Sequence, residues 1–246
     1  MLARSAPAVR AQPPAPRVPK TPDSLIRHPE SPAPKVPKSP QHRLRRQDPG
    51  TLIARVRNDQ RVSVRATPKG PVIAQLSSRN ELGSPQTLAV TRVLPGARYA
   101  VVTTALPNGR LGWIDAPRGA LRLSRTRMTL DVDLSKRLLH VHAGARVVRR
   151  IRVGIGATGS PTPIGRFAVT DKLNGSDYSP VYGCCILALS AHQTHLPTGW
   201  TGGDRIAIHG GSTAGAVSAG CLHASTAELR YLMRLVPLGA QVVIHP

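Results

Sequence analysis

Apolar and polar residues alternate regularly along the C-terminal half of the chain. The strand expected over 128–134 has apolar positions on one face and polar positions on the other: Met128, Leu130, Val132 and Leu134 against Thr129, Asp131 and Asp133. Turn residues follow at Ser135-Lys136 and Ala143-Gly144. The pattern predicts a three-stranded meander that continues through 139–141 and 147–153, with later strands at 167–170, 184–189 and 206–209.

One helix is predicted near the C-terminus. Ser225 and Glu228 have the spacing of a capping box, in which the hydroxyl and the carboxylate each satisfy a free backbone N–H. Apolar residues then follow at helical spacing: Leu229, Leu232, Met233 and Val236. Pro237 and Gly239 end the helix, and a closing strand is expected over 241–245. The predicted fold class is therefore mainly β, with one clear helix.

The middle of the chain has shorter apolar stretches, at 62–64, 72–74 and 99–102, separated by Gly and Pro turns. Such short strands indicate a small β-barrel or sandwich. Residues 108–114 are similar to the turn and Gly-Trp-aliphatic strand of bacterial SH3-like domains. We expect an SH3-like module at 51–123 and a second domain at 124–246.

Residues 1–50 have a different composition. They contain half of the 24 prolines, ten basic residues and three acidic ones. Such a segment cannot bury enough apolar surface to offset its ordering entropy, so we expect a disordered, Pro-rich cationic linker. A solvated tail with no partner is the alternative. No uninterrupted apolar run in these residues is long enough for a transmembrane span or a signal peptide.

The formal net charge of +22 suggests a polyanionic partner. Nucleic acid is not expected, because aromatic residues make up only 3% of the chain and no finger spacing or RNA-binding signature is present. Anionic wall polymers or lipid headgroups suit the same charge. The three cysteines do not make a disulfide framework, and Cys184-Cys185 is expected to pack in an apolar strand.

A histidine and a cysteine are the candidate catalytic pair. His209 ends a predicted buried strand, and Cys221 follows twelve residues later on a glycine-rich loop. A thiol close to an imidazole is what cysteine nucleophilic catalysis requires, and an imidazolium would lower the thiol pKa. Gly220 allows a backbone bend in which N–H groups hold an oxyanion. The alternative is a buried thiol and a hydrogen-bonded histidine without chemistry.

These residues resemble a known signature. His209-Gly210 followed by Ser218-Ala219-Gly220-Cys221 is similar to the L,D-transpeptidase motif, a His-Gly strand end and then Ser-x-Gly-Cys. Three further segments fit the same family in the same order: Val132-Asp133-Leu134-Ser135, Pro161-Thr162-Pro163-x-Gly165-x-Phe167 and Leu187-Ala188-Leu189-Ser190. The resemblance covers about 124–246, and it implies a β-sandwich catalytic domain of the YkuD type.

The resemblance implies a thiol acyltransferase that acts on peptidoglycan stem peptides. Cys221 would attack the carbonyl of a stem, expel the terminal D-alanine and pass the acyl group to an amine of a neighbouring stem. His209 would be the base and later the acid, with the backbone of Gly220 and Cys221 in the oxyanion hole. The Gly210 carbonyl or Ser218 would orient the imidazole, and Tyr182 would line the donor pocket. Carbapenems would acylate Cys221, and no cofactor or metal is implied.

The sequence departs from the family pattern at two places. Members usually carry Arg or Asn two residues after the cysteine, where this chain has His223, and the loop from His209 to Cys221 is a few residues shorter. Because a histidine titrates near neutrality and an arginine does not, recognition of the stem carboxylate through His223 is expected to be weaker or pH-dependent.

Other readings have less support. His140 and His142 have a spacing compatible with zinc, but no third ligand is evident. No pair of carboxylates suits glycoside cleavage. Two alternatives stay open: hydrolysis through the same thioester, as in an L,D-carboxypeptidase, and a wall-binding protein without turnover. The reaction implies an extracytoplasmic, wall-associated location, although no export signal is visible. The sequence does not determine the oligomeric state.

Overall fold

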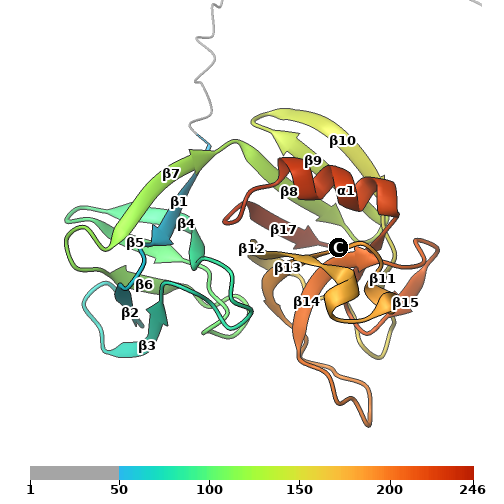
Figure 1. The fold of residues 1–246 in the computed structure, drawn as a ribbon, viewed down its shortest axis with the longest axis horizontal. Helices are drawn as coiled ribbons and strands as arrows, with labels where there is room; N and C mark the ends of the chain where they lie inside the picture. Colours follow the sequence, from blue (N-terminus) through green and yellow to red (C-terminus); the bar gives the residue numbers. More distant parts are fainter. Residues whose placement is uncertain (1–49) are drawn as a thin grey trace, which may run out of the picture. The chain divides into compact units, whose positions relative to one another are not determined.

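The computed structural model describes residues 50–246, which form two β-sheets of seven and eight strands and a short two-stranded sheet (Figure 1). The linker predicted at 1–50 lies outside the described residues except for Gly50. No helix in the described part of the chain is long and apolar enough to cross a membrane.

The first sheet is built from seven antiparallel strands in the order β3-β2-β6-β5-β4-β1-β7. Its strands are β1 (Thr51–Val56), β2 (Arg61–Arg65), β3 (Val72–Ser77), β4 (Thr87–Leu94), β5 (Arg98–Val101), β6 (Gly112–Asp115) and β7 (Leu121–Thr126). Alternate positions, such as Val62 and Val64, are fully buried and form its own core. The comparison with SH3-like domains and the domain boundaries stay predictions.

The second sheet has eight strands in the order β10-β9-β8-β17-β12-β13-β14-β16. They are β8 (Met128–Asp133), β9 (Leu138–Ala143), β10 (Arg146–Arg152), β12 (Gly165–Asn174), β13 (Cys185–His192), β14 (Arg205–Gly210), β16 (Leu222–Ala224) and β17 (Gln241–His245). The strands β11 (Ile155–Gly156) and β15 (Ala216–Ser218) form a separate parallel pair. The predicted meander and closing strand are present as β8, β9, β10 and β17.

The long strand β12 turns the eight-stranded sheet into a sandwich. Residues 165–168 pair with β17, whereas residues 169–174 pair with β13, with a shift in register between Val169 and Asp171. Side chains from both halves then meet in one core, with Phe167 and Leu187 among the largest buried residues. The prediction of a mainly β fold with a sandwich catalytic domain is confirmed.

The helix α1 (Thr226–Leu235) packs against β13 and β14 through Leu229 and Leu232. Only half of the predicted capping box forms. Ser225 Oγ accepts the N–H of Glu228, but the Glu228 carboxylate binds the Arg149 guanidinium at 2.8 and 3.0 Å. A charged, two-pronged partner from β10 is stronger than a neutral backbone N–H, so the carboxylate turns away from its own helix end.

The adjacent cysteines lie where η2 (Pro180–Tyr182) leads into β13. Cys184 and Cys185 are joined by a disulfide, which the sequence analysis did not predict. Cys185 is part of the apolar core, and Cys184 packs against it, so the expected packing also occurs. Within residues 50–246, Cys221 is the free thiol.

Candidate active site

Two short parallel strands bring His209 and the cysteine loop together. β14 carries His209 next to its last residue, and β16 begins directly after Cys221. The register pairs Ile208 with Leu222 and His209 with His223. Both loop and strand end therefore lie at one edge of the sandwich, and Cys221, His209 and His223 line the same cavity.

The imidazole of His209 is held by its own strand end. Its Nδ1 lies 2.7 Å from the Gly210 carbonyl oxygen. Because a carbonyl only accepts hydrogen bonds, Nδ1 carries the proton, and Nε2 keeps its lone pair. The side chain is only 6% exposed. Burial lowers the pKa of His209 to about 4, so the ring is a neutral base at physiological pH.

The pKa of the Cys221 thiol is shifted in the opposite direction to that of His209. Burial raises the pKa of Cys221 above its ordinary value, and a backbone hydrogen bond with Ala207 only partly opposes the shift. The lowering expected from a neighbouring imidazolium does not occur here, because His209 is neutral and burial has the larger effect on the pKa of Cys221. An apolar cavity disfavours both charged forms, so the resting pair is a thiol and a neutral imidazole. No hydrogen bond joins the two side chains among those of the described residues.

Ser218 organises the loop rather than the imidazole. Its hydroxyl donates to the Cys221 carbonyl at 2.6 Å and accepts the N–H of Gly220 at 3.1 Å. Of the two groups predicted to orient His209, the Gly210 carbonyl contacts it and Ser218 does not. The sequence analysis placed the Gly220 N–H in the oxyanion hole. In this conformation that N–H is bound to Ser218 Oγ, so it cannot also donate to an oxyanion.

Gln193 fixes the same loop from outside and was missed from the sequence. Its buried amide nitrogen lies 2.8 Å from the Ala219 carbonyl, and within 3.2 Å of the Ser160 and Pro161 carbonyls. Gly220 has a φ of +116°, and a Cβ there would lie 2.1 Å from Gln193 Nε2. Glycine is therefore required beside the nucleophile, for its backbone angle and for space. A glutamine that follows an apolar strand carries no sequence signal of this contact.

His223 lies beside His209, with the ring centroids 4.8 Å apart. Its Nδ1 donates to the Ser212 carbonyl at 3.2 Å. Burial lowers the pKa of His223 below its ordinary value, and the hydrogen bond to Ser212 opposes the shift. The sequence predicted a residue that titrates close to neutrality. Because burial lowers its pKa, His223 gains its charge at a lower pH than an ordinary histidine.

Tyr182 covers the other side of the imidazole. It comes from η2 and meets His209 edge to face, with 4.8 Å between the ring centroids. The backbone approach is close here, because a Cβ on Gly210 would lie 2.9 Å from the Tyr182 carbonyl oxygen. Tyr182 thus lines the cavity and packs against His209, and its role toward an acyl donor stays a prediction.

The cavity has a volume of about 360 Å³ and mostly apolar walls. Exposed apolar side chains of two segments surround its mouth: Tyr178 and Val181 of residues 174–184, and Leu196 and Trp200 of residues 193–204. Arg205 and Leu82 also belong to the wall. Burial lowers the pKa of Arg205 to about 10, and the guanidinium still stays charged at neutral pH. Periodicity gave no indication that these residues share a site.

The histidines considered for zinc lie elsewhere. His140 and His142 are neighbours on the outer face of β9, with ring centroids 6.3 Å apart. No group of three potential metal ligands occurs in the part of the chain that the structure describes. Asp131 instead accepts a hydrogen bond from His245, which raises the pKa of that histidine.

The comparison with protein families fits this geometry. The L,D-transpeptidase catalytic domain family (YkuD) matches residues 127–244. Residues 127–244 therefore form a catalytic domain of the YkuD family. A search of curated proteins found no match.

Several solved structures are similar to the chain. An L,D-transpeptidase from Mycobacterium smegmatis is 16% identical over 65% of this chain and 82% of that one, with a TM-score of 0.40. L,D-transpeptidase 1 of Mycobacterium tuberculosis is 17% identical over 64% and 75%, with a TM-score of 0.38. An L,D-transpeptidase from Xylanimonas cellulosilytica is 25% identical over 50% and 62%, with a TM-score of 0.36.

Proposed function

We propose that the chain is a peptidoglycan L,D-transpeptidase in which Cys221 is the nucleophile. The observation that carries the proposal is the shared cavity of a free thiol and a neutral imidazole whose Nε2 makes no hydrogen bond within residues 50–246. A neutral base beside an un-ionised thiol suits general-base activation at the moment of attack. Membership of residues 127–244 in the family supplies the substrate class.

The proposed reaction has two halves. His209 Nε2 takes the proton of the Cys221 thiol as sulfur bonds to the stem carbonyl. The tetrahedral intermediate collapses, the bond to the terminal D-amino acid breaks, and the proton passes from His209 to the leaving amine. The amine of a neighbouring stem then attacks the thioester and loses its proton to His209. The C–S bond breaks as the new amide forms, and His209 returns the proton to the Cys221 sulfur.

The backbone N–H of Cys221 is the proposed oxyanion donor. The N–H of Gly220 would contribute only after it leaves Ser218 Oγ, 3.1 Å away. A rearrangement of this loop on substrate binding would supply a second donor in the transition state, where donors of this kind accelerate acyl transfer most.

Hydrolysis is the variant in which water replaces the acceptor amine. It uses the same thioester and yields a shortened stem without a cross-link. Either outcome places the protein outside the cytoplasmic membrane, at the cell wall, and this location is part of the proposal.

Covalent capture tests the nucleophile. The wild-type chain, incubated with a carbapenem, should gain one adduct by intact mass, because the strained lactam carbonyl acylates a reactive thiol. Cys221→Ala should gain none. A matched Cys184→Ala/Cys185→Ala variant, which removes the other two cysteines of the chain, should still form the adduct.

The absence of an adduct on folded wild-type protein would instead support a wall-binding protein without turnover. Turnover on a purified tetrapeptide stem, with and without an added acceptor stem, then separates cross-linking from hydrolysis.

A further inference from the structure

Leu82 brings the N-terminal sheet into the wall of the catalytic cavity. It lies half-buried in the loop between β3 and β4, residues 78–86. All other residues of the cavity wall lie between Leu173 and His223. The N-terminal sheet thus places one apolar side chain in a site whose chemistry belongs entirely to the second domain.

Local hydrogen bonds fix the loop in the conformation that presents Leu82. The Asn80 side-chain oxygen accepts the N–H groups of Leu82 at 3.1 Å and Ser84 at 2.9 Å. Arg79 also donates to the Gly83 carbonyl at 2.6 Å. An asparagine that satisfies two backbone donors in this way stabilises a tight turn, so Leu82 is held at its tip.

Two polar contacts attach the loop to the second domain. Asn80 Nδ2 donates to Asp171 Oδ1 at 2.8 Å, and Glu81 pairs with Arg205. Asp171 is completely buried, and Asn80 is the one hydrogen-bond donor to its side chain among the described residues, while the Arg205 guanidinium lies 3.7 Å from its other carboxylate oxygen. A buried carboxylate without a hydrogen-bond donor is costly, so the loop and Arg205 together stabilise Asp171.

The same contacts lead directly to the catalytic strand. Arg205 is the first residue of β14, which carries His209, and its guanidinium also donates to the Leu189 carbonyl and Thr170 Oγ1. A second attachment lies nearby, where Asn108 exchanges hydrogen bonds with the backbone of His192 at 2.6 and 2.9 Å. Both attachments hold the ends of the β13–β14 hairpin, whose loop forms another part of the cavity wall.

We infer that residues 78–86 are part of the donor-binding site, and that Leu82 packs against the stem peptide that Cys221 attacks. The inference rests on the proposed function. Leu82 is a positioning residue for the substrate: it contributes apolar contact and does not touch the thiol chemistry. A loop that only joined the two domains would not need an apolar side chain directed into the cavity.

Leu82→Ala in the full chain tests the inference. The KM for a tetrapeptide stem should rise about 4- to 15-fold, which is the contribution of one or two buried methylenes. The kcat should stay within about twofold, because uniform binding is lost rather than transition-state contact. Alkylation of Cys221 by iodoacetamide should be unchanged, and Leu82→Met, which keeps the volume, should restore the KM.

Leu123→Ala is the matched control, since Leu123 is an exposed leucine of the same sheet outside the cavity. It should leave KM and kcat unchanged. An unchanged KM in Leu82→Ala, measured beside an active wild type, would overturn the inference alone. A wild type that neither turns over a stem nor accepts a carbapenem would overturn the proposed function, and the inference with it.

Discussion

The charge states of His209 and Cys221 follow from the same burial. Tyr182 and His223 pack against His209, and Cys221 lies in the same mostly apolar cavity wall, so burial favours the neutral form of each side chain. A preformed thiolate and imidazolium pair would need compensating charge, but among the described residues this wall contains, apart from histidines, only Asp204 and Arg205 as charged side chains. The proton therefore moves during attack, and the imidazole is ready for it.

The low pKa of His209 predicts a flat pH profile near neutrality. The base is neutral above its pKa of about 4 and is lost only as the pH falls through that value. Carbapenem acylation of the wild type should therefore show no inflection between pH 5.5 and 7.5. His209→Ala should be slower by about 10²- to 10⁴-fold, the usual contribution of general-base catalysis. Its rate should then rise about tenfold per pH unit, as the thiol ionises unaided.

His142→Ala is the control for this series, because His142 lies on the outer face of β9, away from the cavity. Its profile should follow the wild type. A wild-type inflection close to pH 6.5 would show that His209 is not desolvated.

The lowered pKa of His209 also affects stability. Between pH 6.5 and about 4 the unfolded chain binds the additional proton, so the free energy of unfolding falls as the pH is lowered.

The loop that contains Cys221 needs a glycine at position 220, because neighbouring side chains leave no room for a Cβ there. A Cβ on Gly220 would meet both the Gln193 amide beyond β13 and the side chain of Ile206 in β14, so these two residues leave no room for a side chain there. Parallel pairing of β14 with β16 fixes where this loop starts and ends. A change in the loop is therefore transmitted directly to Cys221, the residue after Gly220.

Gly220→Ala should displace Cys221. The new Cβ would meet Gln193 Nε2 at 2.1 Å, and a φ of +116° is strained for alanine. We expect a loss of about 1 to 3 kcal/mol in the free energy of unfolding, measured by urea titration. Carbapenem acylation should fall at least tenfold, a larger effect than the lost stability alone would give in a still-folded sample.

Gly159→Ala is the matched control, because a Cβ on Gly159 meets nothing within 4 Å and its φ is not positive. It should change neither stability nor acylation by more than a small amount. Normal acylation in folded Gly220→Ala would contradict the assignment of a fixed nucleophile loop.

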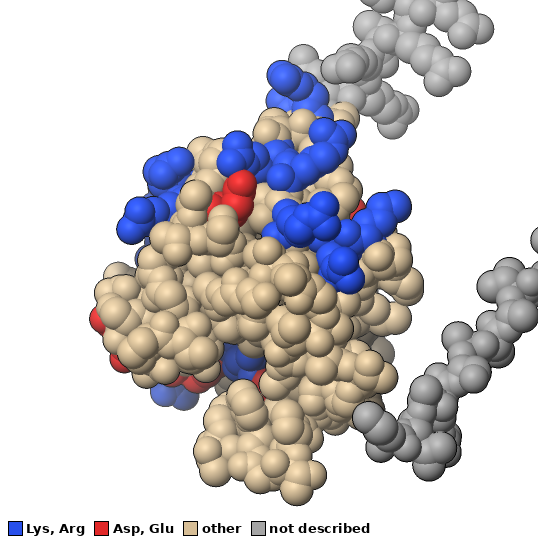
Figure 2. Space-filling model, turned by 90° about the vertical axis from the view of Figure 1, so that its right-hand side faces the viewer, with Lys and Arg blue, Asp and Glu red and all other residues tan. Residues whose placement is uncertain are grey.

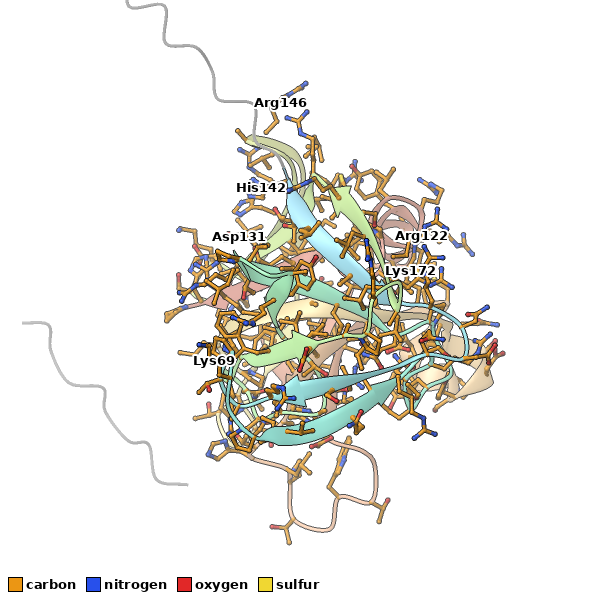
Figure 3. All side chains as sticks on the ribbon, turned by 90° about the vertical axis from the view of Figure 1, so that its left-hand side faces the viewer. Lys69, Arg122, Asp131, His142, Arg146 and Lys172 are labelled. Atoms are coloured by element: carbon orange, nitrogen blue, oxygen red, sulfur yellow. A yellow bond between two sulfur atoms is a disulfide. The ribbon has the colours of Figure 1, made fainter. Side chains whose placement is uncertain are left out.

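At the scale of the whole molecule, one face has a group of positive charges in its upper part. Figure 2 shows Lys and Arg gathered over the upper part of one face. Exposed arginines of β10 and α1 include Arg146, Arg150, Arg230 and Arg234. Arg146 lies at the tip of the β9–β10 hairpin and projects away from the body of the protein (Figure 3). Glu228 neutralises only Arg149 among the arginines of β10.

This basic surface predicts salt-sensitive binding to an anionic wall polymer. A polymer of glycerol phosphate should bind the full chain at low salt, and its affinity should fall steeply as salt rises. Arg230→Gln/Arg234→Gln should reduce the slope of log affinity against log salt by about 1.5, since each lost phosphate contact removes about 0.7 to 0.9. Filter binding or fluorescence anisotropy over a salt series measures the slope.

Arg61→Gln/Arg110→Gln removes the same charge from exposed positions of the N-terminal sheet. A smaller change in this control than in the α1 pair would locate the binding on the surface of α1 and β10. Equal changes in the two variants would show that only the net charge matters.

The sequence by itself determined the elements whose signals are local. Alternation over 128–134 gave β8, helical spacing after Ser225 gave α1, and the His209 and Cys221 motifs gave the candidate pair. The strand and the helix depend on neighbours within a few residues, and the His209 and Cys221 pair depends on a motif that spans thirteen residues of the chain, so the sequence contains the information for each. Whether Cys221 is the nucleophile is tested by the carbapenem adduct experiment.

The tertiary structure decided what depends on distant partners. The parallel pairing of β17 with β8, the hold of Gln193 on the cysteine loop and the entry of Leu82 into the cavity join residues far apart in the sequence. The charge states of His209 and Cys221 belong to the same group, because desolvation is set by whatever surrounds a side chain. Periodicity tells which face of a strand is buried, but not against which residues, and those residues decide the chemistry.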